Sequence, residues 1–188
     1  MKAPNRKMTL DEIKRELAEV ARIGQVFVEG DLCRRAWKPH AVHFMKGDDM
    51  DYDPVATVPL KKTLLRLEKI GRVPCGTTLW RRRPDLPDRG EALLFGRVAG
   101  SPDGGDKPAN RGYQPPLLSK ELKQVFLKGK AAWKMNSKTP AVRLHPPRGI
   151  GVAARGLKAS TTVQLLVPIK DSMGEIAAAL EVHTIALK

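Results

Sequence analysis

The spacing of apolar residues changes close to Pro74. Before Pro74, apolar residues recur every three or four positions, which predicts amphipathic helices. After it they gather in short runs of strand-like composition between turn residues, which predicts strands. We therefore expect an N-terminal helical region over 9–71 and a sheet domain over 72–188, together forming one domain, preceded by a disordered end at 1–8.

The helical region opens with a clear start signal. Thr9 followed by Glu12 is a capping box, in which each side chain satisfies a backbone N–H of the other residue. An apolar stripe follows at helical spacing until Pro39, which cannot donate to a helix. The segment 9–38 is therefore expected to be either one long helix or two adjoining helices.

Another helix is expected after a polar loop. Residues 46–54 combine four aspartates with glycine and proline, a composition typical of loops. Proline is best accepted in the first turn of a helix, and the apolar stripe that follows Pro59 stops at Gly71. We predict a helix that begins near Pro59 and ends before Gly71.

The rest of the chain has the composition of strands with one further helix. TTLWRRR and EALLFGRV are separated by PDLPDRG, which is turn chemistry, so these two runs predict a hairpin. Ser119 is suited to cap a helix that Gly129 ends. This order favours an α+β fold, with an antiparallel sheet of about five or six strands and the N-terminal helices packed on one face. The later strands are expected around 131–135, 141–145 or 150–155, 161–169 and 175–185.

The last two apolar runs resemble a known family. LLVPIKD, a turn and GEIAAALEV place in succession an apolar strand, Pro-Ile, Asp, a turn, Gly-Glu and a second apolar strand, at positions Val167, Pro168, Ile169, Asp171, Gly174, Glu175 and Ala179 to Val182. This pattern resembles the final strands of PAS-like sensor domains, in particular the Cache branch. The helical N-terminus and the helix ELKQVFLKGK are similar to that family's layout. The resemblance implies a PAS-like sheet, a pocket between sheet and helices that holds a small ligand, and a role in signal transduction.

Charge is distributed unevenly along the chain. The net charge is +14, and the segment 107–158 holds twelve cations against one acid. Such a one-sign field attracts anions, whether nucleic acid, phosphate, carboxylate ligands or an acidic protein face, but a solvated basic surface has the same composition. Tyr113 and Trp133 lie within this segment, and aromatic rings among cations are typical of single-strand nucleic-acid grooves. Binding to nucleic acid is therefore the alternative to the sensor hypothesis.

The run WRRRPD supplies the sharpest ligand hypothesis. On a strand, Trp80 and Arg82 share one face while Arg81 and Arg83 share the other. If Trp80 and Arg82 face the helices, a bound carboxylate or phosphate would neutralise the guanidinium. The alternative is that Trp80 packs in the core and all three arginines reach solvent. The candidate residues for a small, anionic ligand are Trp80, Arg82, Tyr113, Trp133 and Arg143.

Evidence for a metal site or for catalysis is thin. His40 and His43 form H-x-x-H close to the aspartates of the 46–54 loop, and they are weak metal candidates because the spacing matches no established ligand pattern. The chain has no nucleophile elbow, no phosphate-cradling glycine loop and no paired acid and base, so we expect a non-catalytic protein. No cofactor is identified.

Cysteine usage and hydropathy place the chain in a cellular context. Cys33 and Cys75 form no C-x-x-C pair, so each is expected to be a small buried hydrophobe. No apolar run reaches the roughly eighteen residues of a membrane span, and the N-terminus lacks the apolar core of a signal peptide. We expect a cytoplasmic protein, or an extracytoplasmic one if the chain is an excised sensor domain. A homodimer is expected through the apolar stripe of the helical N-terminus.

Overall fold

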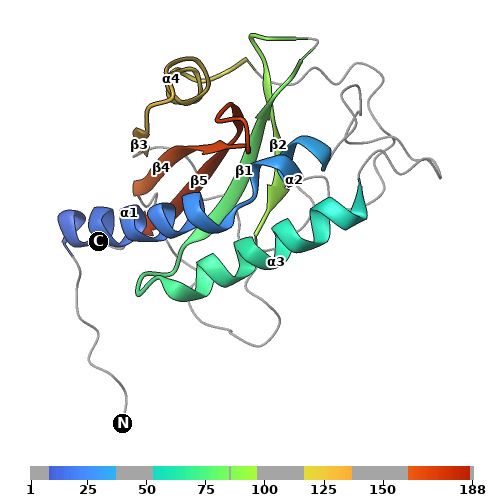
Figure 1. Cartoon of the computed structure of the whole chain (residues 1–188). Helices are drawn as coiled ribbons and strands as arrows, with labels where there is room; N and C mark the ends of the chain where they lie inside the picture. Colours follow the sequence, from blue (N-terminus) through green and yellow to red (C-terminus); the bar gives the residue numbers. More distant parts are fainter. Residues whose placement is uncertain (1–8, 37–52, 85, 97–116, 137–160, 187–188) are drawn as a thin grey trace, which may run out of the picture.

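The computed structural model describes residues 9–36, 53–84, 86–96, 117–136 and 161–186. These residues form an α+β fold with one five-stranded antiparallel sheet (Figure 1), which confirms the predicted fold class. The expected disordered end at 1–8 and the expected strand at 141–145 or 150–155 lie outside the described residues. The elements are α1 (Leu10–Phe27), α2 (Gly30–Arg35), α3 (Pro54–Ile70), β1 (Gly76–Arg82), β2 (Gly90–Phe95), α4 (Lys120–Lys128), β3 (Ala132–Asn136), β4 (Thr161–Lys170) and β5 (Ile176–Ala186).

The strands lie in the order β2-β1-β5-β4-β3, and every neighbouring pair is antiparallel. Two hairpins, β1–β2 and β4–β5, are formed by strands adjacent in sequence, as the turn residues predict. The last strand, β5, is inserted between β1 and β4. It is therefore the central strand, and apolar clusters pack on both of its faces.

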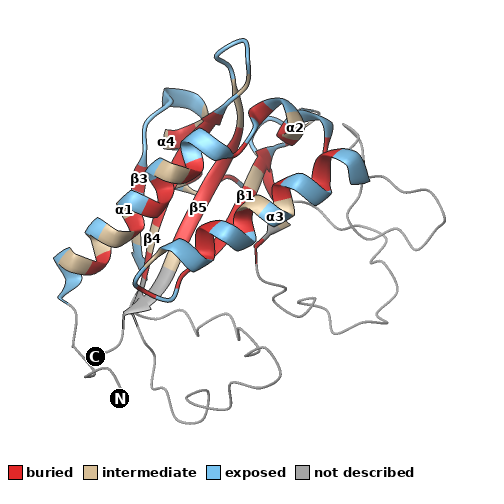
Figure 2. Cartoon of the chain, turned by 60° about the horizontal axis from the view of Figure 1, so that its bottom comes forward, coloured by how far each residue is buried: buried red, intermediate tan, exposed pale blue. Residues whose placement is uncertain are grey.

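The helices α1, α2 and α3 pack on one face of the sheet, here called the helical face (Figure 2). The capping box at the start of α1 is present: the Thr9 hydroxyl accepts from the Glu12 N–H at 3.2 Å, and the Glu12 carboxylate accepts from the Thr9 N–H at 2.8 Å. The predicted stripe of α1 is buried against the sheet, which is the usual way an amphipathic helix is stabilised. Its buried residues are Ile13, Leu17, Val20, Ala21 and Gly24.

The described part of this segment, residues 9–36, forms two helices rather than one. Val28 has extended backbone angles and its N–H bonds to the carbonyl of Gly24, so α1 ends there. Glu29 is also extended, and α2 begins at Gly30. The change of direction allows the second helix to meet the turn between β4 and β5 instead of continuing past the sheet.

The predicted start of the next helix is wrong. Helix α3 begins at Pro54, where Asp53 caps it by accepting the Val55 N–H at 2.8 Å, and Pro59 lies inside the helix. Pro54 occupies the first-turn position that the prediction assigned to Pro59. The interior proline removes one backbone hydrogen bond, but the buried stripe of Leu60, Leu64 and Leu67 still attaches the helix to the sheet.

The opposite face of the sheet, here called the α4 face, carries a second and smaller apolar cluster. Ser119 caps α4 by accepting the Leu122 N–H at 3.2 Å, and Gly129 ends it in a left-handed conformation with φ of 63°. Both boundaries agree with the prediction. The buried members of this cluster are Leu118, Leu122, Val125, Ala132, Leu166 and Ala179.

Two further expectations concern burial and membranes. Cys33 and Cys75 form no disulfide and are buried, with exposures of 3% and 5%, as predicted. Within the described ranges, no helix is both long and apolar enough to cross a bilayer.

Candidate functional site

A row of polar side chains lies on the α4 face of the two central strands. The Trp80 indole Nε1 donates to Glu181 Oε2 at 2.7 Å. His183 Nδ1 lies 3.1 Å from Glu181 Oε1. The geometry does not meet that of a hydrogen bond, so the contact is an ion pair only with a protonated imidazole. Only 8% of Glu181 is exposed. We call these three residues the Trp80–Glu181–His183 row.

The alternation of β5 accounts for this row. Leu180 and Val182 point to the helical face and are fully buried there, so Glu181 and His183 point to the α4 face. On β1, Gly76 is the direct partner of His183. A Cβ built on Gly76 would lie 2.6 Å from His183 Nε2, so the imidazole occupies the space that a side chain would need. Glycine at position 76 therefore lets the ring lie against the β1 backbone.

Trp80 and Arg82 share the α4 face, as predicted for alternate residues of a strand. Trp80 is partly buried and packs against the smaller apolar cluster. Arg82 is exposed, and its Nε donates to the Pro87 carbonyl at 2.7 Å. Arg82 pairs with Gly90, over which the Leu118 side chain lies at 2.6 Å from the position of an added Cβ. The indole and the guanidinium therefore flank one region of the sheet beside α4.

The two other arginines of this run show that the alternative, in which all three arginines reach solvent, is wrong. Arg81 and Arg83 point to the helical face and are 8% and 6% exposed. Glu91 lies directly opposite Arg81 on β2 and is 1% exposed. Its Oε1 accepts from Arg81 Nε at 2.6 Å and lies 3.4 Å from Arg83 Nη1. The anionic partner of the buried guanidinium groups thus includes a carboxylate of the chain itself.

The remaining candidates are separated from Trp80 or lie outside the described residues. Trp133 is 41% exposed on edge strand β3 and pairs with Leu165, whose side chain belongs to the core of the helical face. Trp80 and Trp133 are therefore on opposite faces of the sheet. Tyr113, Arg143, His40 and His43 lie outside the described residues. Among the residues that are described, no group of three potential ligands could hold a metal ion.

Glu181 and His183 are the members of this site that sequence reasoning missed. The available signal was the triplet EVH inside an otherwise apolar run. In a central strand, two polar residues separated by one apolar residue indicate that one face is polar. The identity of β5 as the central strand, which gives this pattern its meaning, follows only from the strand order.

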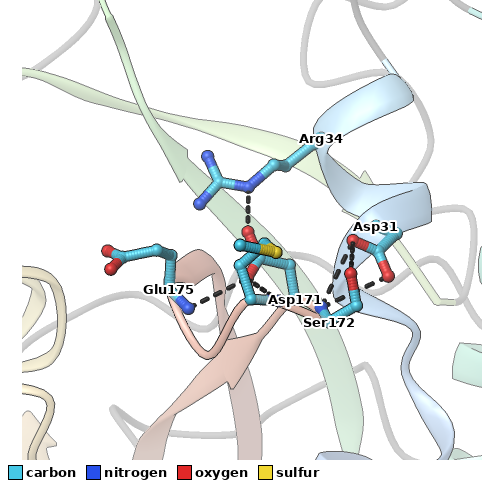
Figure 3. Close-up of polar contacts among 6 residues, drawn as sticks. Asp31, Arg34, Asp171, Ser172 and Glu175 are labelled. Atoms are coloured by element: carbon cyan, nitrogen blue, oxygen red, sulfur yellow. Dashed lines mark hydrogen bonds and ion pairs between the residues drawn. The ribbon is translucent and has the colours of Figure 1, made fainter.

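A second polar network joins α2 to the turn between β4 and β5 (Figure 3). The Asp171 carboxylate accepts hydrogen bonds from the backbone N–H of Met173 at 3.0 Å and of Glu175 at 2.9 Å. It also accepts from Nε of Arg34, which comes from α2. Burial of the Asp171 side chain alone would raise its pKa, but the hydrogen bond from Arg34 and those from the turn amides outweigh it and lower the pKa.

The same turn receives a second anchor from α2. Asp31 accepts from the Ser172 hydroxyl at 3.1 Å and from its N–H at 3.3 Å. Gly30 lies so close to the turn that an added Cβ would collide with the Lys170 carbonyl group and would lie 2.6 Å from the Asp171 nitrogen. Backbone contact and two side-chain pairs therefore attach α2 to the β4–β5 hairpin.

Comparisons with known proteins place the chain in no family: no protein-family model matches it, and no curated protein matches it.

Proposed function

We propose that this protein is a non-catalytic ligand-binding or sensory module of PAS/Cache type, which holds a small anionic ligand on the α4 face of its sheet. The observation that carries the proposal is the Trp80–Glu181–His183 row, a set of largely buried polar groups on the two central strands. The five-stranded antiparallel sheet with the N-terminal helices on one face agrees with the layout that the resemblance implies, and it supports the same assignment.

The row is not what packing alone would select. Burying a carboxylate, an imidazole and an indole N–H costs free energy that apolar side chains of similar size avoid. On the helical face of the same strand, Leu180 and Val182 are fully buried without such a cost. The contrast between the two faces of β5 supports a role in recognition for its polar side.

The charge of the surroundings favours an anion. Arg82 lies on the same side of β1 as Trp80, and only its Nε has a partner among the described residues. The two terminal nitrogens of its guanidinium can form the fork that binds carboxylate or phosphate. The indole of Trp80 offers an adjacent apolar surface, so a small organic carboxylate or phosphate fits this pair.

The packing of β5 provides a route from such a ligand to the N-terminal helices. Leu180 is the sequence neighbour of Glu181, and its side chain occupies the space beside Gly24 of α1. A shift of β5 caused by a ligand on the α4 face would therefore be felt directly by α1, because packed interiors transmit small displacements. This connection supports a sensory role in addition to simple binding.

Native mass spectrometry of the purified protein, followed by calorimetric titration with a panel of small carboxylates and phosphates, tests the proposal. We expect one ligand class to bind. R82Q and W80F should each lower the affinity at least about tenfold, a loss on the scale of one charged hydrogen bond. R66Q and W133F should leave the affinity unchanged. The controls are matched, because Arg66 is an exposed residue of α3 and Trp133 lies on the helical face. Absence of any bound or binding anion, or equal losses in R82Q and R66Q, would overturn the proposal.

A further inference from the structure

The outward side of α4 presents a row of lysines. Residues 120, 123, 124, 127 and 128 recur at helical spacing and therefore lie on one side of the helix. The opposite side of α4, with Leu122 and Val125, is buried against the sheet. We call Lys120, Lys123 and Lys128, the three cations of the outward side, the α4 lysine stripe.

The charge of this stripe is not balanced within the part of the chain that the structure describes. Lys120, Lys123 and Lys128 are exposed, and none of them has an ion-pair partner among the described residues. Residues 117–136 contain five lysines and one acid, Glu121. By contrast, three exposed arginines of the N-terminal helices, Arg22, Arg34 and Arg35, are each paired with a carboxylate. The stripe is thus a local excess of positive charge on an ordered helix.

The chemistry of the stripe selects among anionic partners. Lysine ammonium groups are flexible point charges, which suit a repeating phosphate chain better than a single planar anion that needs a rigid fork. A membrane-surface helix must bury an apolar face in the bilayer, but the apolar side of α4 already packs against the sheet. Leu127 is the single apolar residue among positions 120, 123, 124, 127 and 128 of the outward side. An acidic protein interface would be expected to centre on aromatic or arginine anchors, which these five positions do not contain.

We propose that the α4 lysine stripe binds the phosphodiester backbone of nucleic acid without reading its sequence. From Lys120 to Lys128 the helix advances about 12 Å, and a duplex presents about one charge every 1.7 Å of its axis, so each lysine can reach a phosphate. The stripe points away from the sheet, so this binding and that of a small ligand beside Trp80 are separate activities.

The test measures binding of labelled single-stranded and double-stranded oligonucleotides by fluorescence anisotropy, between about 50 and 200 mM salt. The variant K120Q/K123Q/K128Q is compared with K62Q/R66Q/K69Q, which removes the same charge from an exposed stripe of α3 on the other face of the sheet. We expect the first variant to lower the slope of log K against log salt by about 2.7 on duplex and the second to leave it unchanged. The single variant K123Q should lower the slope by about 0.9, so the inference stays testable if the triple variant folds poorly.

Three results would overturn this inference. The first is that no oligonucleotide binds the wild-type chain at the lowest salt. The second is that the two triple variants lose equal affinity, which would indicate a response to net charge only. The third is binding to vesicles of anionic lipid without binding to oligonucleotides, which would identify a membrane surface as the partner.

Discussion

Replacing Gly30 by alanine should detach α2 from the β4–β5 hairpin. At a position whose backbone alanine can adopt, this change usually stabilises a protein, by about 0.4–1 kcal/mol. Here the new Cβ would collide with the Lys170 carbonyl group and lie 2.6 Å from the Asp171 nitrogen, whereas carbon atoms prefer separations of about 3.5 Å or more. All the colliding atoms belong to the backbone and cannot rotate away. The helix must therefore move outward by about 1 Å, a distance that follows from these contact radii.

The free energy of this change can be worked from the contacts at risk. An outward shift weakens two hydrogen bonds between Asp31 and Ser172 and the pair between Arg34 and Asp171. Because these three contacts are partly exposed, each contributes about 1 kcal/mol, or about 2–4 kcal/mol together, which is less than hydrogen bonds to fully buried charged groups contribute. Subtracting the usual gain from replacing glycine leaves a net loss of about 1–3 kcal/mol. For a chain of this size the loss corresponds to a fall in Tm of roughly 3–10 °C.

The assay is thermal and urea unfolding of the wild type, G30A, R34Q and the double variant. If Gly30 acts by holding α2 in place, the losses from G30A and R34Q should be less than additive, since both remove the same contact. A G30A protein as stable as the wild type, or losses that add fully, would refute the reasoning.

Two further outcomes follow from the pKa shifts. The pKa of Asp171 is lowered in the folded state, so its carboxylate stabilises the protein above its usual pKa of about 3.9, and this contribution is lost as the pH falls through the lower folded value. The difference in unfolding free energy between wild type and D171N should therefore shrink on acidification. A difference that grows instead would contradict the assigned hydrogen bonds. Burial, with a smaller effect of the Glu29 charge, raises the pKa of the Cys33 thiol to about 12. In a C75S background we therefore expect a thiol reagent at pH 8 to label Cys33 only after unfolding. Fast labelling of the native protein would contradict this expectation, because it would show that the surroundings of Cys33 open in the folded state.

Elements fixed by neighbouring residues are the ones that sequence reasoning placed well. The start of α1 depends on Thr9 and Glu12, which lie three positions apart. The helix α4 begins and ends where Ser119 and Gly129 predict, because capping is a local interaction. The start of α3 was misplaced because two prolines compete for the same role, and the cap supplied by Asp53 decides in favour of Pro54.

The burial of charged groups could not be predicted in the same way. Arg81 and Arg83 are buried because Glu91 lies opposite Arg81 on the neighbouring strand. That register depends on an irregularity between Leu79 and Trp80, which no local pattern announces. Arginine is seldom buried without a partner, so composition supported the alternative of three exposed arginines, and pairing between strands overturns it.

The central position of β5 connects these findings to the proposed function. One side of this strand is apolar and holds α1 through Leu180, while the other side carries Glu181 and His183. An edge strand with the same alternation would place its polar residues in solvent at little cost, so the pattern would carry no information about recognition. Because β5 has strands on both sides, its polar residues are largely enclosed, and their burial has to be offset by hydrogen bonds within the row or to a ligand. The same strand thus links a polar face suited to recognition with an apolar face suited to transmission.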